Sequence, residues 1–198
     1  QCFKRMQSES LYPDSVTFIC ILKACGSAGA IDKGNQIHNE VVLRGLLEKD
    51  IAIGNVVVDM YAKCGVLTKA HEVLEELPVR DAISWNSLIC GYVGSGDNEK
   101  VLSCFYQMQY QGISPDVVTF ICTLKACGKL GSLVKGEELH AKIVIKGSEI
   151  QPLVGNSLIN MYIKLGCLCH AQQVFDTLPL RTLVSWTTII SGYTECGE

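Results

Sequence analysis

Apolar residues along the chain recur with the spacing of an amphipathic α-helix. In the first half of residues 82–116 they fall at positions i, i+3, i+4 and i+7: Trp85, Leu88, Ile89 and Tyr92. The second half repeats the pattern at Val101, Cys104, Phe105 and Met108. Gly94 and Gly96 separate the two stripes, and Asp97 is suited to cap the second helix. Helices of about a dozen residues are marginal in isolation, so the pattern predicts a helical hairpin that packs against neighbouring hairpins.

This hairpin pattern recurs along the whole chain in groups of three. The segment SVTFICILKACG, which begins at Ser15, returns as VVTFICTLKACG from Val117. Likewise GNVVVDMYAKCG at 54–65 returns as GNSLINMYIKLG at 155–166. Units that contact only their sequence neighbours build a solenoid. We therefore predict an all-α fold, an α-solenoid of helix-turn-helix units.

The repeats set the predicted unit boundaries and helix ends. We expect one continuous array without a linker, divided into residues 1–14 (the end of a unit), 15–50, 51–81, 82–116, 117–151, 152–182 and 183–198 (the start of a unit). Gly65 and Gly166 are predicted to end helices, where a positive φ is needed. Hydroxyl residues at one aligned position are predicted to be N-caps of the first helices: Thr17, Ser84, Thr119 and Ser185.

Composition narrows the functional classes. A chain of 198 residues with 48% hydrophobic and 19% charged residues predicts a folded domain with a large core. The eleven cysteines fall largely within apolar stripes, which favours free thiols in a reducing compartment. The net charge of −3 gives no general attraction to nucleic acid, so any such binding must come from local side chains. No long apolar run predicts a membrane span, and we expect any transit peptide to lie upstream.

The residues of the candidate catalytic and metal-binding motifs differ between the two copies of the repeat group. His38 and Glu40 match the H-x-E of zinc deaminases, but no P-C-x-x-C follows, and the second copy has Lys142 in place of the glutamate. His38 and His140 fall on apolar stripes and are predicted to be core residues. The cluster Cys167–His170 has no ligand residue in its first copy. We expect no cofactor, no metal and no catalytic activity.

The three units of each group have distinct signatures. TFxxxLKACG…G…IH, GNxxxxMYxKxG…A…LP and SWNSLICGY…CFYQMQYQGISPD resemble the L, S and P motifs of the PLS-class pentatricopeptide repeat (PPR) proteins of land plants. The resemblance covers essentially the whole chain. It implies a right-handed superhelix and one-base-per-repeat reading of single-stranded RNA.

In this family, base recognition is attributed mainly to the fifth and last residues of each unit. The resemblance assigns base reading here to Asn55 with Asp81, Asn86 with Asp116, Asn156 with Thr182, and Thr187, whose partner would lie beyond residue 198. The units at 15–50 and 117–151 have Ile19 and Ile121 at the fifth position, and these cannot hydrogen-bond a base.

The hydrogen-bonding groups of asparagine and aspartate suit the recognition of a base. The fifth residue is expected two positions after the N-cap, in the first helical turn, so that the side chains form a row along one edge of the stacked units. An amide offers both a donor and an acceptor, as does the Watson–Crick edge of a pyrimidine, and a carboxylate accepts from N3–H of uracil. Asn–Asp pairs therefore favour uracil. The alternative is that an Asn near a helix start merely caps it.

Two further sets of residues follow from the resemblance. The second residue of each unit would pack between successive bases, with ordinary core packing as an equal alternative: Val16, Ala52, Ile83, Val118, Leu153 and Val184. Three lysines align with phosphate contacts in the family, although a lysine near a helix C-terminus also favours the helix dipole: Lys63, Lys129 and Lys164.

The functional prediction is a non-catalytic module that binds single-stranded RNA selectively in a mitochondrion or chloroplast. The resemblance implies the recognition part of a cytidine-to-uridine editing or RNA-processing factor, with protein partners of an editing complex and no membrane. The parent protein could carry a C-terminal deaminase-like extension. The competing hypothesis is a protein-binding scaffold similar to tetratricopeptide repeats, which the negative charge favours, although the W-x₂-L-G-x₂-Y signature is absent.

Overall fold

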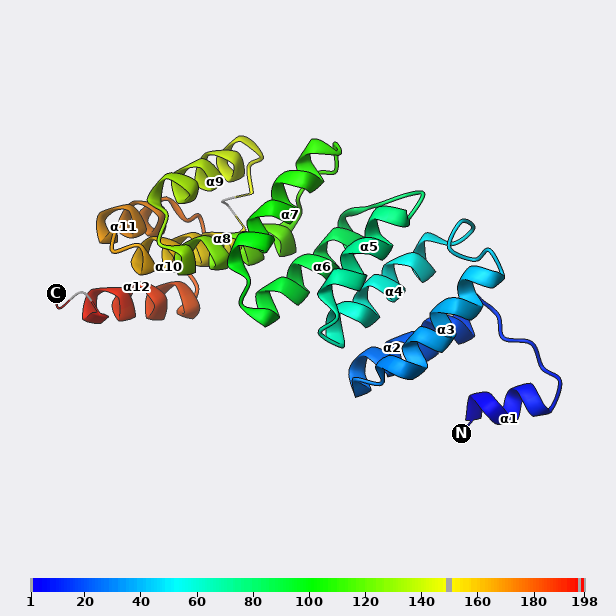
Figure 1. Cartoon of the computed structure of the whole chain (residues 1–198). Coiled ribbons are helices and arrows are strands. Elements are labelled where there is room, and N and C mark those ends of the chain that lie inside the picture. The colour runs from blue at the N-terminus through cyan, green and yellow to red at the C-terminus, as the bar shows by residue number, and fades with distance from the viewer. Residues whose placement is uncertain (1, 149–150, 196, 198) are drawn as a thin grey trace. The chain divides into compact units, whose positions relative to one another are not determined.

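The computed structural model describes residues 2–148, 151–195 and 197. The described residues form twelve helices and no strand, joined by short connections (Figure 1). This confirms the all-α prediction. The chain divides into two compact units, Gln1–Ser95 and Gly96–Glu198, and the division falls inside the predicted 82–116 repeat, between its two helices. Each unit is described by itself.

The first unit is built from two rows of helices. Its helices are α1 (Cys2–Ser8), α2 (Ser15–Ala28), α3 (Ile31–Leu43), α4 (Ile51–Lys63), α5 (Leu67–Glu76) and α6 (Ala82–Ser95). The first helices of successive hairpins form one row, in which α4 packs between α2 and α6. In the other row, α3 contacts α2 and α4, and α5 contacts α4 and α6. Each hairpin thus packs against the next one in sequence, as in a helical solenoid.

The second unit repeats this arrangement. Its helices are α7 (Asn98–Tyr110), α8 (Val117–Leu130), α9 (Leu133–Ile145), α10 (Pro152–Lys164), α11 (Leu168–Thr177) and α12 (Leu183–Glu195). Here α10 takes the place of α4 and packs between α8 and α12. A continuous apolar core, which includes Phe105, Phe120 and Tyr162, joins these helices.

The predicted apolar stripes are the buried faces of the helices. Trp85, Leu88 and Ile89 of α6 are almost completely inaccessible to solvent, and so are Cys104 and Phe105 of α7. The stripes of the other hairpins are buried in the same way, with a few members, such as Ile21 and Cys64, only half-buried. A period of 3.6 residues therefore identified the core correctly.

The predicted N-caps were wrong by three residues. Asp14 and Asp116 are the N-caps of α2 and α8, and the backbone amides of Thr17 and Thr119 donate to their Oδ1 atoms at 2.8 and 3.0 Å. Thr119 completes a capping box, because its Oγ1 accepts a hydrogen bond from the Asp116 amide. A hydroxyl residue at the third helical position closes this reciprocal pair. The same displacement applies to Ser84 and Ser185, described below.

Glycines end several helices as predicted. Gly65 and Gly166 follow α4 and α10 with φ of 77° and 71°, a backbone conformation that costs a residue with a Cβ atom energy. One boundary was misplaced: Gly94 lies within α6, which continues to Ser95, and the chain turns at Gly96 with φ of 80°. Asp97 caps α7 as predicted and accepts from the Lys100 amide at 3.1 Å.

The two repeated histidines pair with tyrosines across neighbouring hairpins. His38 is buried, as predicted, and its Nδ1 lies 3.0 Å from the Tyr61 hydroxyl. His140 makes the same contact with Tyr162 at 2.9 Å but is only half-buried. Burial lowers the pKa of His38, which favours its neutral form. Both histidines thus have a structural role between hairpins.

Candidate nucleic-acid interface

The fifth-position Asn55 lies in the second turn of α4, not in the first turn as predicted, because the helix starts directly after its N-cap, Asp50. Its side chain is only 7% exposed. The amide Nδ2 donates to both carboxylate oxygens of Asp81 at 3.2 Å, and Oδ1 is buried without a hydrogen-bond partner among the described residues. The structure therefore brings the predicted pair Asn55 and Asp81 into direct contact.

A close helix–loop approach produces this contact. A Cβ atom on Gly54 would lie 2.7 Å from Cδ2 of Leu77, so glycine lets the Leu77 side chain pack directly against α4. The segment after α5 leads from Leu77 to Asp81, and its crossing of α4 brings the carboxylate to Asn55, which follows Gly54 in sequence.

Asp81 also caps the next helix. Its Oδ1 accepts from the Ser84 amide at 2.9 Å, and Ser84 Oγ accepts from the Asp81 amide at 3.0 Å. This reciprocal pair at the start of α6 places Ser84 in the third helical position, which corrects its predicted role as the cap. The last residue of the unit therefore serves two functions: it starts α6 and it binds the amide of Asn55.

The equivalent pair in the second unit is not joined. Thr182 is hydrogen-bonded to Ser185, whose amide donates to Thr182 Oγ1 at 3.3 Å, so Thr182 takes the capping position that had been predicted for Ser185. Asn156 is half-buried, and its Oδ1 has no partner within the described part of the chain. The threonine hydroxyl is bound to its own helix start, which leaves the Asn156 amide without the carboxylate that Asn55 has.

The remaining predicted base-reading residues are placed as follows. Asn86 lies on α6 in the first unit and is 9% exposed, whereas Asp116 caps α8 in the second unit. Thr187 is exposed on α12, and its Oγ1 donates to the Val184 carbonyl at 3.0 Å. At the end of the first partial repeat, Asp14 accepts hydrogen bonds from Thr17 that lower its pKa.

The side chain at the second position of each repeat is exposed to solvent. Five of them are large aliphatic side chains with 45% to 65% of their surface accessible to solvent, and the sixth is a small exposed alanine: Val16, Ile83, Val118, Leu153, Val184 and Ala52. Core packing within a unit does not account for apolar residues that face solvent at one repeated position. Their exposure favours the alternative in which they contact a ligand.

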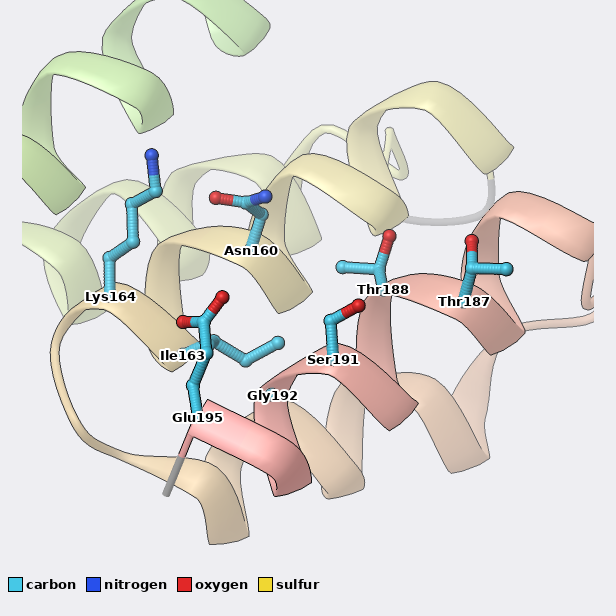
Figure 2. A pocket seen from close by; sticks show the side chains of 8 residues that line it. All are labelled: Asn160, Ile163, Lys164, Thr187, Thr188, Ser191, Gly192 and Glu195. Atoms are coloured by element: carbon cyan, nitrogen blue, oxygen red, sulfur yellow. The ribbon is translucent and has the colours of Figure 1, made fainter. Parts of the chain in front are cut away.

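The candidate phosphate-contacting lysines are also exposed. Lys63 and Lys164 end α4 and α10 and line grooves against the following first helices, α6 and α12. Figure 2 shows the second groove, with Lys164 and Asn160 extending from α10 and Thr188 and Ser191 from α12. Lys129 lies on α8, in its last turn.

Sequence reasoning overlooked the residue four positions before the lysine. Asp59 Oδ2 lies 2.7 Å from Lys63 Nζ in the first groove, and Asn160 occupies the aligned position in the second. An acidic residue four positions before a lysine in a predicted helix is a recognisable ion-pair signal. It was present in the sequence but was not used.

Clusters of metal-ligand side chains and membrane-spanning helices are two further features that bear on function. Among the side chains that the structure describes, no three or more His, Cys, Asp or Glu residues cluster as metal ligands would. Cys169 Sγ lies 3.5 Å from His170 Nδ1, which is an exposed contact between sequence neighbours. None of the described helices has the length and apolarity to span a bilayer.

The paired helix rows and the repeated exposed residues define a tandem helical-hairpin repeat protein. Models of the PPR repeat family match residues 80–129, and models of the PPR repeat match residues 55–81 and 184–198. The chain belongs to the pentatricopeptide repeat family. It is 37% identical over 195 residues to the Arabidopsis thaliana pentatricopeptide repeat-containing protein At5g55740, chloroplastic, covering 98% of this chain and 23% of that protein. It is also 37% identical over 200 residues to the putative pentatricopeptide repeat-containing protein At3g15130 from Arabidopsis thaliana, covering 99% of this chain and 29% of the relative.

Solved structures show the same fold. The maize pentatricopeptide repeat protein PPR10 superposes with a TM-score of 0.73 at 21% identity, over 96% of this chain and 28% of PPR10. PPR10 in complex with an 18-nt psaJ RNA element superposes with a TM-score of 0.69 at 21% identity, over 97% of this chain and 29% of that chain. The chain thus spans less than a third of the length of these two relatives and of PPR10.

Proposed function

We propose that this chain is a non-catalytic module that binds single-stranded RNA selectively, with one nucleotide facing each hairpin and the hairpins with a polar fifth residue reading its base. Two observations carry the proposal: the contact of Asn55 with Asp81, and exposed aliphatic residues at one repeated position of the hairpins. A base that stacks on such residues would place its polar edge towards the amide and carboxylate, which can recognise it. PPR10, which shares the fold, has been solved in complex with RNA.

The burial of Asn55 sets a condition on this function. Its Oδ1 is inaccessible and lacks a partner, so a base must enter between the first helices to reach it. A buried acceptor without a partner costs about 1–3 kcal/mol. A pyrimidine that donates to this oxygen would remove that cost, which favours opening of the helix row around the nucleotide.

The residues at the fifth and last positions predict a base preference for each repeat along the chain. With RNA running 5′ to 3′ along the chain from Ser15, the hairpins would accept any base, uracil, uracil, any base, a pyrimidine and a purine. We further propose that the module is the recognition part of a PLS-class RNA editing or processing factor in a chloroplast or mitochondrion. At5g55740 is named as a chloroplastic protein, which supports an organellar location.

Fluorescence anisotropy with a short labelled RNA tests the proposal. RNA with UU in the central register should bind more tightly than RNA with GG there, and Asn86→Thr should shift the second of these positions towards a purine. Equal affinity for UU and GG, together with no effect of Asn86→Thr, would rule out base reading by these residues. Binding should weaken as the salt concentration rises, with a slope set by the number of phosphate groups that lysines contact.

One observation favours protein binding as a second candidate function. The repeats at 15–50 and 117–151, which have isoleucine at the fifth position, also share an exposed aliphatic residue at the end of the second helix. These residues are Leu43 on α3 and Ile145 on α9, each 87% exposed. Exposed apolar residues at equivalent places suit a protein contact. Leu43→Ser with Ile145→Ser would abolish such a contact while leaving RNA affinity unchanged.

A further inference from the structure

Two equivalent grooves in the repeated hairpins differ in where their carboxylate lies: Asp59 is one helical turn from Lys63 on α4, whereas the second groove has Asn160 at the aligned position and Glu195 on α12. In the first unit, the groove between α4 and α6 is lined by Asp59 and Lys63. In the second unit, the groove between α10 and α12 is lined by Asn160 and Lys164 (Figure 2). A carboxylate in one copy is thus an amide in the other, at the ninth position of the unit.

The two lysines are held in equivalent places. A Cβ atom on Gly26 of α2 would lie 3.4 Å from Cδ of Lys63, and one on Gly128 of α8 would lie 3.4 Å from Cβ of Lys164. Each lysine stem therefore lies against a glycine of the preceding first helix. The structure positions both lysine stems in the same way, and the grooves differ in the groups that surround the ammonium ends.

In the first groove the lysine is already neutralised. Lys63 Nζ lies 2.7 Å from Asp59 Oδ2, one helical turn away on α4, and the two side chains are 50% and 27% exposed. A phosphate that approached Lys63 would have to compete with this carboxylate and would be repelled by it.

In the second groove the lysine has no ion pair among the described residues. Asn160 is uncharged, and Glu195, which comes from α12 across the groove, is not in ion-pairing distance of Lys164. Lys164 also lines a wider groove between α8, α10 and α12, together with Lys125, and no acidic residue lines that groove. Leu153, Val184 and Asn156, three of the candidate nucleotide contacts, line the same groove.

We infer that the ninth residue of the repeat, Asp59 in residues 51–81 and Asn160 in residues 152–182, decides whether the lysine four positions later binds the RNA backbone. Asn160 leaves Lys164, with Lys125, available for a phosphodiester group, whereas Asp59 withholds Lys63 from it. The inference rests on the proposed RNA binding, and it assigns the main backbone contact of these two grooves to the second unit. Asp59 restrains binding, and Lys125 adds a contact that the aligned lysines did not predict.

Exchanging the two ninth residues tests the inference. Asp59→Asn should tighten binding of a labelled single-stranded RNA about threefold at low salt, the effect of one exposed ion pair. It should also steepen the slope of log affinity against log salt concentration by about 0.7, the value for one added contact to a single strand. Asn160→Asp should weaken binding by a similar factor and make the slope shallower.

Two controls separate this effect from general electrostatics. Glu72→Gln removes the same charge from the ion pair that Glu72 makes with Lys69 on α5, at 3.0 Å, and should change affinity less than about 1.5-fold, which is less than half of the free-energy change expected for Asp59→Asn. In a Lys63→Gln background, Asp59→Asn should lose its effect, because the two residues act as a pair. Circular dichroism confirms that each variant keeps its helices.

The possible results are distinct. If the unmodified chain binds RNA but Asp59→Asn leaves affinity and salt slope unchanged, the inference is wrong and the proposed function stands. If Glu72→Gln tightens binding as much as Asp59→Asn, the effect is one of net charge and the inference is again wrong. If the unmodified chain binds no single-stranded RNA, both proposals fail.

Discussion

Asp81 joins the helix cap to the candidate base-reading site, so replacing it by alanine should affect both folding and binding. Asp81→Ala removes the acceptor of the Ser84 amide at the start of α6. Loss of an N-cap costs about 1 kcal/mol. The substitution also removes the acceptor of the buried Asn55 amide, and an unpaired buried donor costs about 1–3 kcal/mol. We therefore expect the free energy of unfolding to fall by about 2–4 kcal/mol.

Asp81→Asn is the matched variant. Asparagine is as good an N-cap as aspartate, and its side-chain oxygen can still accept from Asn55, so the free energy of unfolding should fall by less than about 1 kcal/mol. The loss of the carboxylate changes recognition instead, because an amide can donate to the unprotonated N3 of cytosine. The preference of the second hairpin should move from uracil towards cytosine.

Urea unfolding followed by circular dichroism and RNA anisotropy measure the two effects separately. The reasoning would be refuted if Asp81→Ala unfolded within about 0.5 kcal/mol of the unmodified chain, since a cap and a buried partner cannot both be lost at so small a cost. Unchanged discrimination between uracil and cytosine in Asp81→Asn would refute the assignment to base reading alone.

Three further predictions concern stacking, pH and helix packing. Leu153→Ala should weaken RNA binding by about 1 kcal/mol, by loss of a base contact, yet leave the urea midpoint unchanged, because the side chain is 65% exposed. Burial lowers the pKa of His38, so the stability that its neutral form provides is present above the unfolded-state pKa of about 6.5 and is lost as the pH falls from there through the lower folded-state pKa. Unfolding at pH 7 and pH 5 should show this loss, and His38→Gln should reduce it. On α6, Gly91→Ala should destabilise by about 1–3 kcal/mol because its Cβ would lie 2.6 Å from Leu67, whereas Gly94→Ala, which meets no atom within 4 Å, should be neutral or stabilising in the same urea assay.

The sequence was sufficient to predict the hairpins because their determinants are local. The apolar period marks the buried face of each helix, and glycines such as Gly65 mark where a helix ends. The helix starts were less certain, because the hydroxyl of Thr119 and the carboxylate of Asp116 are both typical caps, and only the reciprocal bonds show which residue lies outside the helix.

The site depended on contacts that no local pattern specifies. Asn55 meets Asp81 because the segment after α5 crosses α4 at Gly54, and the length of that segment determines where the carboxylate arrives. The resemblance to the repeat family named both residues, but neither their hydrogen bonds nor the burial of Asn55 follows from it. The spacing of Asp59 and Lys63 and the asparagine at the aligned position of the second copy are both visible in the sequence. What the structure adds is the ion pair between Asp59 and Lys63 and the grooves that both copies line.

Asp81 both caps α6 and contacts Asn55, and this double role limits which residues a repeat can use to read RNA. The last residue of one repeat is also the N-cap of the next first helix, where a side chain that accepts from a backbone amide stabilises the helix start. Asp14, Asp50 and Asp116 accept in this way with carboxylates, and Thr182 with a hydroxyl. Gln151, before α10, is the exception: its side chain makes no cap hydrogen bond, and Pro152 begins the helix. Aspartate, asparagine, serine and threonine are the side chains that both cap helices and offer a short polar group to a base. A change of base preference made within this set should leave the fold intact, whereas a larger or apolar last residue would weaken the next hairpin before its effect on recognition could be measured.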